Sequence, residues 1–209
     1  PFPVRDLVGE WNYDGVRILD SIGHTVSERE NPRAEFFRAG RSFRWDDLDM
    51  LYFAGYALWN YLTFPYLLME AGVRIQKISR HDTGAILHVE FPKDFPTHSR
   101  NQAFHIDAYG KLLRHDYTAD VIGGWAHASN ICLTCEKVDG MVFYPRRRVL
   151  PRIGRNLIVP MPKLVWIELT EIEVHKFQDA PRQELNVYQC MARDAKLFVP
   201  RVVSERSGS

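Results

Sequence analysis

Cysteine is scarce in this chain, which has three in 209 residues: Cys132, Cys135 and Cys190. A small, odd number of cysteines argues against a disulfide framework and is typical of a reducing compartment. The N-terminal stretch also lacks the basic segment followed by an apolar segment that marks a signal peptide. We therefore expect a cytoplasmic protein.

An excess of charge of one sign is missing as well, since 27 Lys and Arg residues face 26 Asp and Glu residues. Nucleic acids and anionic membranes attract strongly basic surfaces, so the balance predicts no nucleic-acid partner. The motifs of nucleotide-phosphate loops, serine hydrolases and zinc proteases are absent too. We expect no cofactor and no metal, because the lone Cys132-x-x-Cys135 pair lacks the further ligands of a zinc site.

What is present suits one globular domain. Hydrophobic residues make up 45% of the chain and aromatic residues 12%, enough for a sizeable core or an aromatic-lined cavity. We predict a single domain over 1–203, with 204–209 as a disordered tail or a cloning remnant. A homodimer is left open.

One strong helix is predicted over 46–71. Asp46 and Asp47 suit its N-terminus, where carboxylates meet free N–H groups, and Gly72 suits its C-terminal cap. Pro65 removes a backbone donor within this run. The helix is therefore expected to kink there, or to break into two helices with Thr63 capping the second.

This helix is apolar on nearly every side, which is typical of a buried or membrane-spanning helix. Polar residues and Pro65 interrupt the run, so we expect a buried helix and no membrane span. Tyr56, Trp59 and Asn60 are its candidate ligand-binding residues. A buried Asn60 amide needs a partner, which is either strand backbone or a ligand.

Most of the remaining chain has strand patterns with short connections: 9–19, 33–40, 73–79, 85–91, 99–107, 111–118, 140–150 and 163–177. Successive strands of this kind form an antiparallel meander. The predicted fold is α+β: a strongly curved antiparallel β-sheet wrapped around a central apolar helix, as an open or half barrel of lipocalin-like form. An apolar, aromatic-lined cavity is expected between sheet and helix.

The hairpin over 99–118 carries the candidate catalytic residues. A two-residue turn pairs Phe104 with Leu113, whereas a bulge at Gly110 pairs His105 with Leu113. The bulged form is favoured, because glycine supplies the positive φ that it needs. It places His105, His115 and Tyr117 on one face of the sheet, and Arg114, Asp116 and Gln102 on the other.

Two imidazoles and a phenol that face a cavity would form a proton-transfer group, because histidine titrates near neutral pH. We therefore take His105, His115, Asp116 and Tyr117 as candidate catalytic residues, and Phe104 as a candidate ligand-binding residue. The alternative is that these side chains lie on the solvent face of the sheet.

Alternation along 140–150 sends Arg147 to the same face as apolar Phe143 and Val149. A buried guanidinium needs a carboxylate partner, for which we expect Asp116 or Asp120. The alternative is that Arg147 binds a carboxylate or phosphate of a substrate.

Four segments resemble a group of bacterial proteins of about this length to which no reaction is assigned: NPRAEF, WDDLDMLYFAGYALWNYLTFPYLL, THSRNQAFHIDAYGKLLRHDYTADVIGG and DGMVFYPRRRVLPR. The resemblance covers about 31–172 and implies a single domain from a bacterium. It transfers no catalytic residue. Where the group reads PTRRRV, this chain has Tyr144, which would narrow a ligand pocket. The expected sheet resembles the half barrel of lipoprotein-sorting carriers, or a calycin.

Two functions follow as hypotheses. One is a cofactor-independent cyclase, isomerase or dehydratase that acts on a small hydrophobic molecule by His, Tyr and Asp acid–base chemistry. The other is a non-catalytic carrier or sensor of lipid-like ligands.

Overall fold

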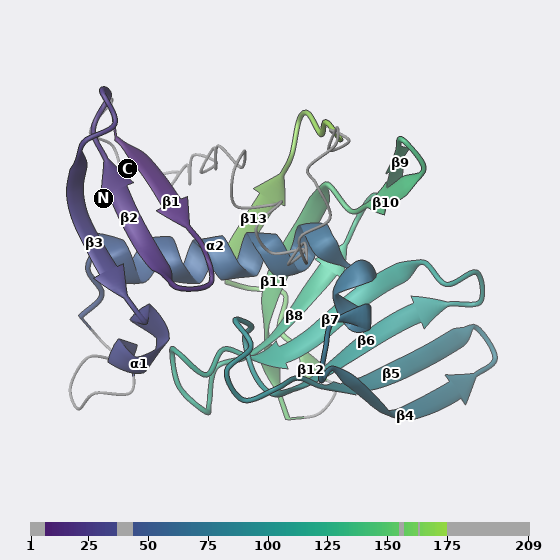
Figure 1. Ribbon diagram of the computed structural model, residues 1–209. Coiled ribbons are helices and arrows are strands. Elements are labelled where there is room, and N and C mark those ends of the chain that lie inside the picture. The colour runs from purple at the N-terminus through teal and green to yellow at the C-terminus, as the bar shows by residue number, and fades with distance from the viewer. Residues whose placement is uncertain (1–6, 37–43, 155–156, 163, 175–209) are drawn as a thin grey trace, which may run out of the picture.

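The computed structural model describes residues 7–36, 44–154, 157–162 and 164–174. These residues form two α-helices, one 3₁₀ helix and thirteen strands. The strands pair antiparallel in three sheets, so the predicted α+β class and antiparallel pairing are confirmed (Figure 1).

The N-terminal sheet has the order β1-β2-β3, with bounds Val8–Trp11, Gly15–Leu19 and Thr25–Glu30. Helix α1, Pro32–Phe36, follows it directly. The strand predicted over 33–40 is therefore wrong for the described residues 33–36, and 37–40 lie outside them. Asn31 turns the chain with φ 47°, and Pro32 then begins the helix, where its missing N–H is no loss.

Helix α2 spans Asp47–Thr63. Asp46 caps it, as predicted, in a capping box: the Asp46 side chain accepts from the Asp49 N–H, and the Asp49 side chain accepts from the Asp46 N–H. Arg29 of β3 binds both carboxylates at 2.6 and 2.5 Å. The helix cap thereby joins α2 to the N-terminal sheet.

The predicted break at Pro65 is confirmed, because α2 ends at Thr63 and the 3₁₀ helix η1 spans Tyr66–Met69. Thr63 does not cap this second helix. Its hydroxyl instead donates to the Trp59 carbonyl at 2.7 Å, within α2. This local bond satisfies the hydroxyl before the chain reaches the turn.

The large sheet has the order β12-β11-β8-β7-β6-β5-β4, and β13 also pairs with β11. The bounds are β4 Arg74–His81, β5 Gly84–Glu90, β6 Asn101–Asp107, β7 Leu112–Thr118, β8 His127–Cys132, β11 Arg146–Ile153, β12 Leu157–Ile158 and β13 Val165–Glu168. A separate hairpin pairs β9, Glu136–Val138, with β10, Met141–Phe143. Tyr144 and Pro145 thus divide the strand predicted over 140–150.

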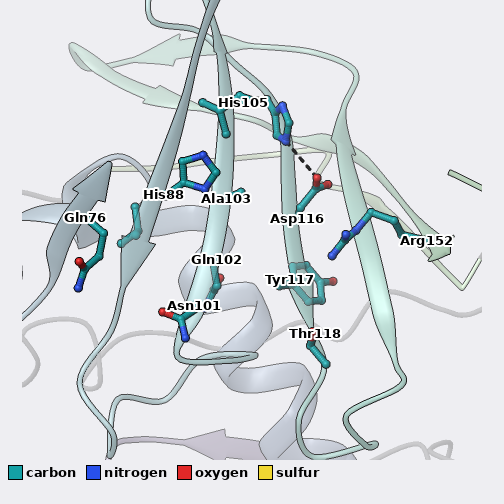
Figure 2. Close-up of a pocket in the computed structure, with 12 residues that line it drawn as sticks. Gln76, His88, Asn101, Gln102, Ala103, His105, Asp116, Tyr117, Thr118 and Arg152 are labelled. Carbon is teal, nitrogen blue, oxygen red and sulfur yellow. Dashed lines mark hydrogen bonds and ion pairs between the residues drawn. The ribbon is translucent and has the colours of Figure 1, made fainter. Parts of the chain in front are cut away.

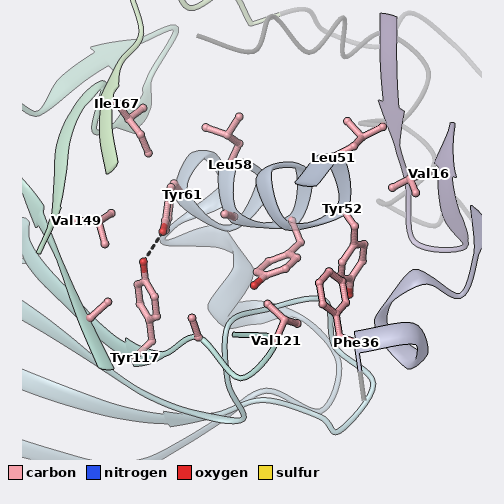
Figure 3. Packing of buried hydrophobic residues seen from close by; sticks show 14 of the residues in the cluster. Val16, Phe36, Leu51, Tyr52, Leu58, Tyr61, Tyr117, Val121, Val149 and Ile167 are labelled. Atoms are coloured by element: carbon pink, nitrogen blue, oxygen red, sulfur yellow. Dashed lines mark hydrogen bonds between the residues drawn. The ribbon is translucent and has the colours of Figure 1, made fainter. Parts of the chain in front are cut away.

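The described strands do not close into a barrel, and the large sheet does not wrap around a central helix. Helix α2 lies between the N-terminal sheet and the large sheet (Figure 1). One core cluster joins all three layers, since it contains Val16 of β2, Leu51 of α2 and Val149 of β11 (Figure 3). The predicted enclosure failed because a second, smaller sheet covers the other side of the helix.

The described residues contain no helix that is long and apolar enough to cross a membrane. The strand predicted over 163–177 is wrong for 169–174, because β13 covers only Val165–Glu168 and these later described residues are not in a strand. Residues 175–177 and the predicted tail over 204–209 lie outside the described residues. The predicted single domain and cytoplasmic location stay predictions.

Candidate functional site

The β6–β7 hairpin decides which side chains meet. Gly110 has φ 83°, as the predicted bulge requires, and near the turn Ile106 pairs with Leu112. A second bulge follows, because His105 pairs with Arg114 and leaves Leu113 as an extra, exposed residue. Neither predicted register therefore holds beyond the turn.

The second bulge moves His105 to the other face of the sheet. Phe104 pairs with His115 and Ala103 with Asp116. Side chains alternate along a strand, so His115 and Tyr117 face α2, and Asp116 faces away with His105. The prediction that His105 shares a face with His115 and Tyr117 was wrong.

On the inner face, a buried polar cluster joins α2 to the sheet. Its centre is His98, which lies in the segment between β5 and β6 and is 0% exposed. The Tyr61 hydroxyl lies 2.8 Å from the Tyr117 hydroxyl (Figure 3). It also lies 2.9 Å from His98 Nε2, and the Tyr56 hydroxyl lies 3.3 Å from His98 Nδ1. The rings of His98 and Tyr117 stack with centroids 3.7 Å apart.

Burial holds the members of this cluster in their neutral forms. It lowers the pKa of His98 to about 3, with a further contribution from the Arg33 charge, and it lowers the pKa of His115 well below its ordinary value. Burial also raises the pKa of Tyr61 to about 12, and that of Tyr117 well above its ordinary value. Neutral groups of this kind suit a structural role better than proton transfer at neutral pH.

A second chain of hydrogen bonds continues the cluster. His115 Nε2 bonds to Gln102 Oε1, and Gln102 donates to Thr97 Oγ1 at 2.7 Å. Thr97 donates to Asn60 Oδ1 at 2.8 Å, and Asn60 donates to the carbonyls of Tyr56 and Pro96. Asn60 is therefore satisfied by backbone and Thr97, so its amide does not await a ligand.

Arg147 is buried, as alternation predicts, but its predicted carboxylate partner is wrong. It donates to the carbonyls of Tyr144 and Tyr61 at 2.9 and 2.6 Å, and its guanidinium lies over both rings at 5.4 and 5.0 Å. Among the described residues, Asp116 instead pairs with Arg114. Carbonyl dipoles and aromatic faces stabilise the charged guanidinium, the role that was predicted for a carboxylate. Burial lowers the pKa of Arg147.

The other candidate ligand-binding residues also lie in the packed interior. Phe104 stacks on His115 with centroids 4.2 Å apart, and the Tyr144 hydroxyl accepts from the Leu112 N–H at 2.8 Å. Trp59 packs on Trp11 of the N-terminal sheet, 5.9 Å away. Stacked rings thus occupy the part of the helix–sheet interface where the apolar cavity was expected.

The outer face of the large sheet offers a different site. Asp116 is 6% exposed and accepts hydrogen bonds from Ser129 Oγ at 2.7 Å and His105 Nε2 at 3.0 Å. Arg114 Nη2 lies 3.0 Å from the same carboxylate. Burial alone would raise the pKa of Asp116, but the hydrogen bonds from His105 and Ser129 and the Arg114 charge lower it below its ordinary value. Asp116 is therefore ionised at neutral pH.

One ring nitrogen of His105 lies close to both Asp116 and Arg114. Its Nε2 lies 3.0 Å from Asp116 Oδ2 and 2.9 Å from Arg114 Nη2. One nitrogen cannot donate to the first and accept from the second at once. The carboxylate is the stronger partner, so Nε2–H donates to Asp116; in the tautomer with this N–H, the lone pair of an uncharged ring is on Nδ1.

A groove of about 470 Å³ opens over this pair (Figure 2), a volume within the range of small-molecule sites. Strands β4 to β7 and β11 supply its lining: Gln76, Ile86, His88, Val89, Asn101, Gln102, Ala103, His105, Asp116, Tyr117, Thr118 and Arg152. Figure 2 shows His88, His105, Asp116 and Arg152 around one space. Of the four predicted catalytic residues, His105 and Asp116 thus bond to each other here.

Sequence reasoning missed His98, His88 and Arg152. His98 follows Pro96-Thr97 in a segment without strand alternation, so no pattern indicates its burial. His88 lies in the strand predicted over 85–91, and Arg152 lies just after the strand predicted over 140–150. These two strands are far apart along the chain, so the sequence does not indicate that the two side chains line one groove. The described residues contain no group of three or more His, Cys, Asp or Glu side chains that could hold a metal ion.

No protein-family model, no curated protein and no solved structure matches this chain. The functional argument therefore depends on the geometry of the site.

Proposed function

We propose that the protein binds a small molecule in the outer groove and moves a proton on it with His105, without a cofactor. The observation that carries this proposal is the buried, ionised Asp116 that holds one nitrogen of His105 at the wall of a groove. A carboxylate–imidazole pair is a frequent arrangement for general base catalysis, because the carboxylate orients the ring and stabilises the imidazolium that forms.

The proposed step is the removal of a proton next to a carbonyl group. His105 Nδ1 would accept the proton, and Asp116 would stabilise the charge that appears on the ring. The same ring would then return the proton to a different atom of the substrate. Isomerases, cyclases and dehydratases share this sequence of steps, so the groove supports this group of reactions rather than one of them.

His115 and Tyr117 have no part in the proposed step. Both side chains face α2 and are packed there against Phe104 and His98. Polar side chains from several strands line the groove. The sequence had instead suggested a hydrophobic ligand in an aromatic-lined pocket. We therefore propose a ligand with hydrogen-bonding groups as well as an apolar part that contacts Ile86, which pairs with His105 across the sheet.

The carrier of lipid-like ligands is the weaker proposal. It needs an apolar space between a half barrel and its enclosed helix. In the described residues, a second sheet covers one side of α2, and stacked rings fill the other.

The test is exchange of carbon-bound hydrogen for deuterium, followed by proton NMR in D₂O with a panel of small ketones, aldehydes and oxo acids. A protein that removes a proton next to a carbonyl accelerates this exchange even when the full reaction is unknown. His105→Gln should abolish the exchange, because an amide cannot serve as the base. Loss of a general base costs on the order of 10²- to 10⁴-fold in rate.

The matched control is His81→Gln, since His81 is an exposed histidine on the edge strand β4, outside the groove lining. Asp116→Asn separates positioning from general base catalysis: it should lower the rate and change its dependence on pH, while His105 remains. Exchange that is unchanged in His105→Gln, or lost equally in His81→Gln, would contradict the proposal.

A further inference from the structure

We infer that His88 binds the carbonyl oxygen of the substrate in the outer groove, and that Ala103 leaves the space in which the carbonyl group lies. This inference rests on the proposed function, because it adds a second catalytic group to the same groove. Removal of a proton next to a carbonyl group places negative charge on the carbonyl oxygen. A hydrogen-bond donor that faces this oxygen therefore supplies what the base alone does not.

Three paired residues form a row across the groove. His88 of β5 pairs with Ala103 of β6, and Ala103 pairs with Asp116 of β7. Paired residues point to the same face of a sheet, and all three line the groove (Figure 2). Adjacent strands lie about 4.8 Å apart, which puts the two ends of the row about 10 Å apart. The methyl group of Ala103 is too short to fill this width, so it forms a floor between two walls.

His105 belongs to the neighbouring row. It pairs with Ile86, two residues before His88 on β5, so the two imidazoles are diagonal neighbours on one face of the sheet. Diagonal neighbours on adjacent strands lie about 7 Å apart, a distance within reach of aromatic and other long side chains. A small molecule above Ala103 can therefore contact both rings at once.

The two rings offer opposite hydrogen-bonding groups. His105 Nε2–H donates to Asp116, so Nδ1 of the uncharged ring is an acceptor. On His88, Nε2 lies 3.2 Å from Ser79 Oγ. The hydroxyl hydrogen rotates to suit its partner, and the imidazole nitrogen is the more basic of these two atoms, so Ser79 donates and Nδ1 of His88 carries the ring hydrogen. A protonated His88 would donate from Nδ1 as well.

Nδ1 of His88 is open to a ligand, because none of the described residues bonds to it. The amides of the groove lining have partners within the protein. Gln76 donates to Glu90, and Gln102 is turned to the interior, where it donates to Thr97. The carbonyl oxygen of a ligand above the floor therefore finds its donor at His88.

The step that follows uses both rings. The C–H bond next to the carbonyl breaks, the proton goes to His105 Nδ1, and the electron pair of that bond forms a carbon–carbon double bond. The π electrons of the carbonyl move to its oxygen, which accepts a hydrogen bond from His88 Nδ1–H, and no proton leaves His88. The substrate class is thus an aldehyde or ketone whose oxygen lies toward β5 and whose acidic C–H lies toward β7.

Variants of His88 test this role in the deuterium-exchange assay. His88→Ala should lower kcat about 10²-fold with little change in KM, because a donor that acts in the transition state is lost. His88→Gln should recover much of this rate, since its amide N–H can donate. The matched control is His81→Ala, an exposed histidine of β4 outside the groove lining. Equal rates in His88→Ala and His81→Ala, or equal losses in His88→Ala and His88→Gln, would overturn the inference.

Binding is tested without turnover. The probes are hydroxyacetone and 1,2-propanediol, which lacks the carbonyl group, and the readout is the imidazole signals in ¹⁵N-resolved NMR. A saturable shift of His88 Nδ1 is expected with hydroxyacetone, and a smaller one with the diol. Ala103→Leu should remove this shift by filling the floor, while the His105 signal reports that the fold is intact. A His88 signal that ignores hydroxyacetone, or a shift that survives in Ala103→Leu, would overturn the inference.

The two proposals fail in different ways. Exchange that requires His105 and is indifferent to His88 would overturn the inference and leave the proton-transfer function. Hydroxyacetone that binds at His88, together with no exchange on the whole panel, would count against the proton-transfer function alone.

Discussion

His98 predicts how the stability of this protein depends on pH. Its pKa is about 3 in the folded state because it is fully buried, against an ordinary value of 6.5. Between these values the unfolded chain binds a proton on this residue and the folded chain does not. Stability is therefore fully present above about pH 6.5 and is lost as the pH falls below that value.

The magnitude follows from the difference between the two states. At pH 5 the solution is about 1.5 units below the ordinary pKa, and each unit is worth about 1.4 kcal/mol. His98 should therefore lower the free energy of unfolding by about 2 kcal/mol between pH 7 and pH 5. His115 acts in the same direction, because burial lowers its pKa as well.

The assay is urea unfolding at pH 7 and pH 5, followed by tryptophan fluorescence at constant ionic strength. His98→Gln has no imidazole to protonate, so the difference between the two pH values should shrink by about 2 kcal/mol, even though the variant is less stable at pH 7. The control is His24→Gln, since the His24 side chain is 77% exposed. A difference in His98→Gln as large as in the wild type would refute the argument that buried, neutral His98 causes the acid sensitivity.

Three further predictions concern a buried hydrogen bond, a close contact and a turn. Tyr61→Phe and Tyr117→Phe should each destabilise the protein by about 1–2 kcal/mol, and the double variant should lose less than the sum, because one hydrogen bond joins the two hydroxyls; a double-mutant cycle in urea checks this. Gly55→Ala should destabilise by about 1–3 kcal/mol despite better helix propensity, since a Cβ there would collide with the Trp11 side chain. Gly110→Ala should cost about 1 kcal/mol in the same assay, because φ is 83° in otherwise open space.

Local signals predicted the helix well. The N-cap at Asp46 and the break at Pro65 depend on neighbouring backbone groups, which sequence patterns record directly. The strand predicted over 33–40 failed for a local reason too. Asn31 and Pro32 start a helix, and this local signal overrides the strand pattern of the residues that follow.

The candidate site was predicted only in part. The turn at Gly110 follows from local chemistry, but the bulge at Leu113 depends on the interior, where the Leu112 N–H bonds to the hydroxyl of Tyr144, a residue between β10 and β11. Strict alternation could not anticipate that extra residue. Arg147 was correctly placed inside the protein, but its partners are carbonyls and rings, which charge pairing does not predict.

The extra residue in β7 also bears on how this hairpin tolerates change in length. Removing Leu113 would bring Leu112 and Arg114 into consecutive pairs with Ile106 and His105, as in a regular ladder, and every later pair could stay in place. Removing Asp116 would instead exchange interior and exterior for the residues of β7 that follow it, Tyr117 and Thr118. A shortened chain should therefore fold when the loss falls at Leu113, and fail a few positions further on.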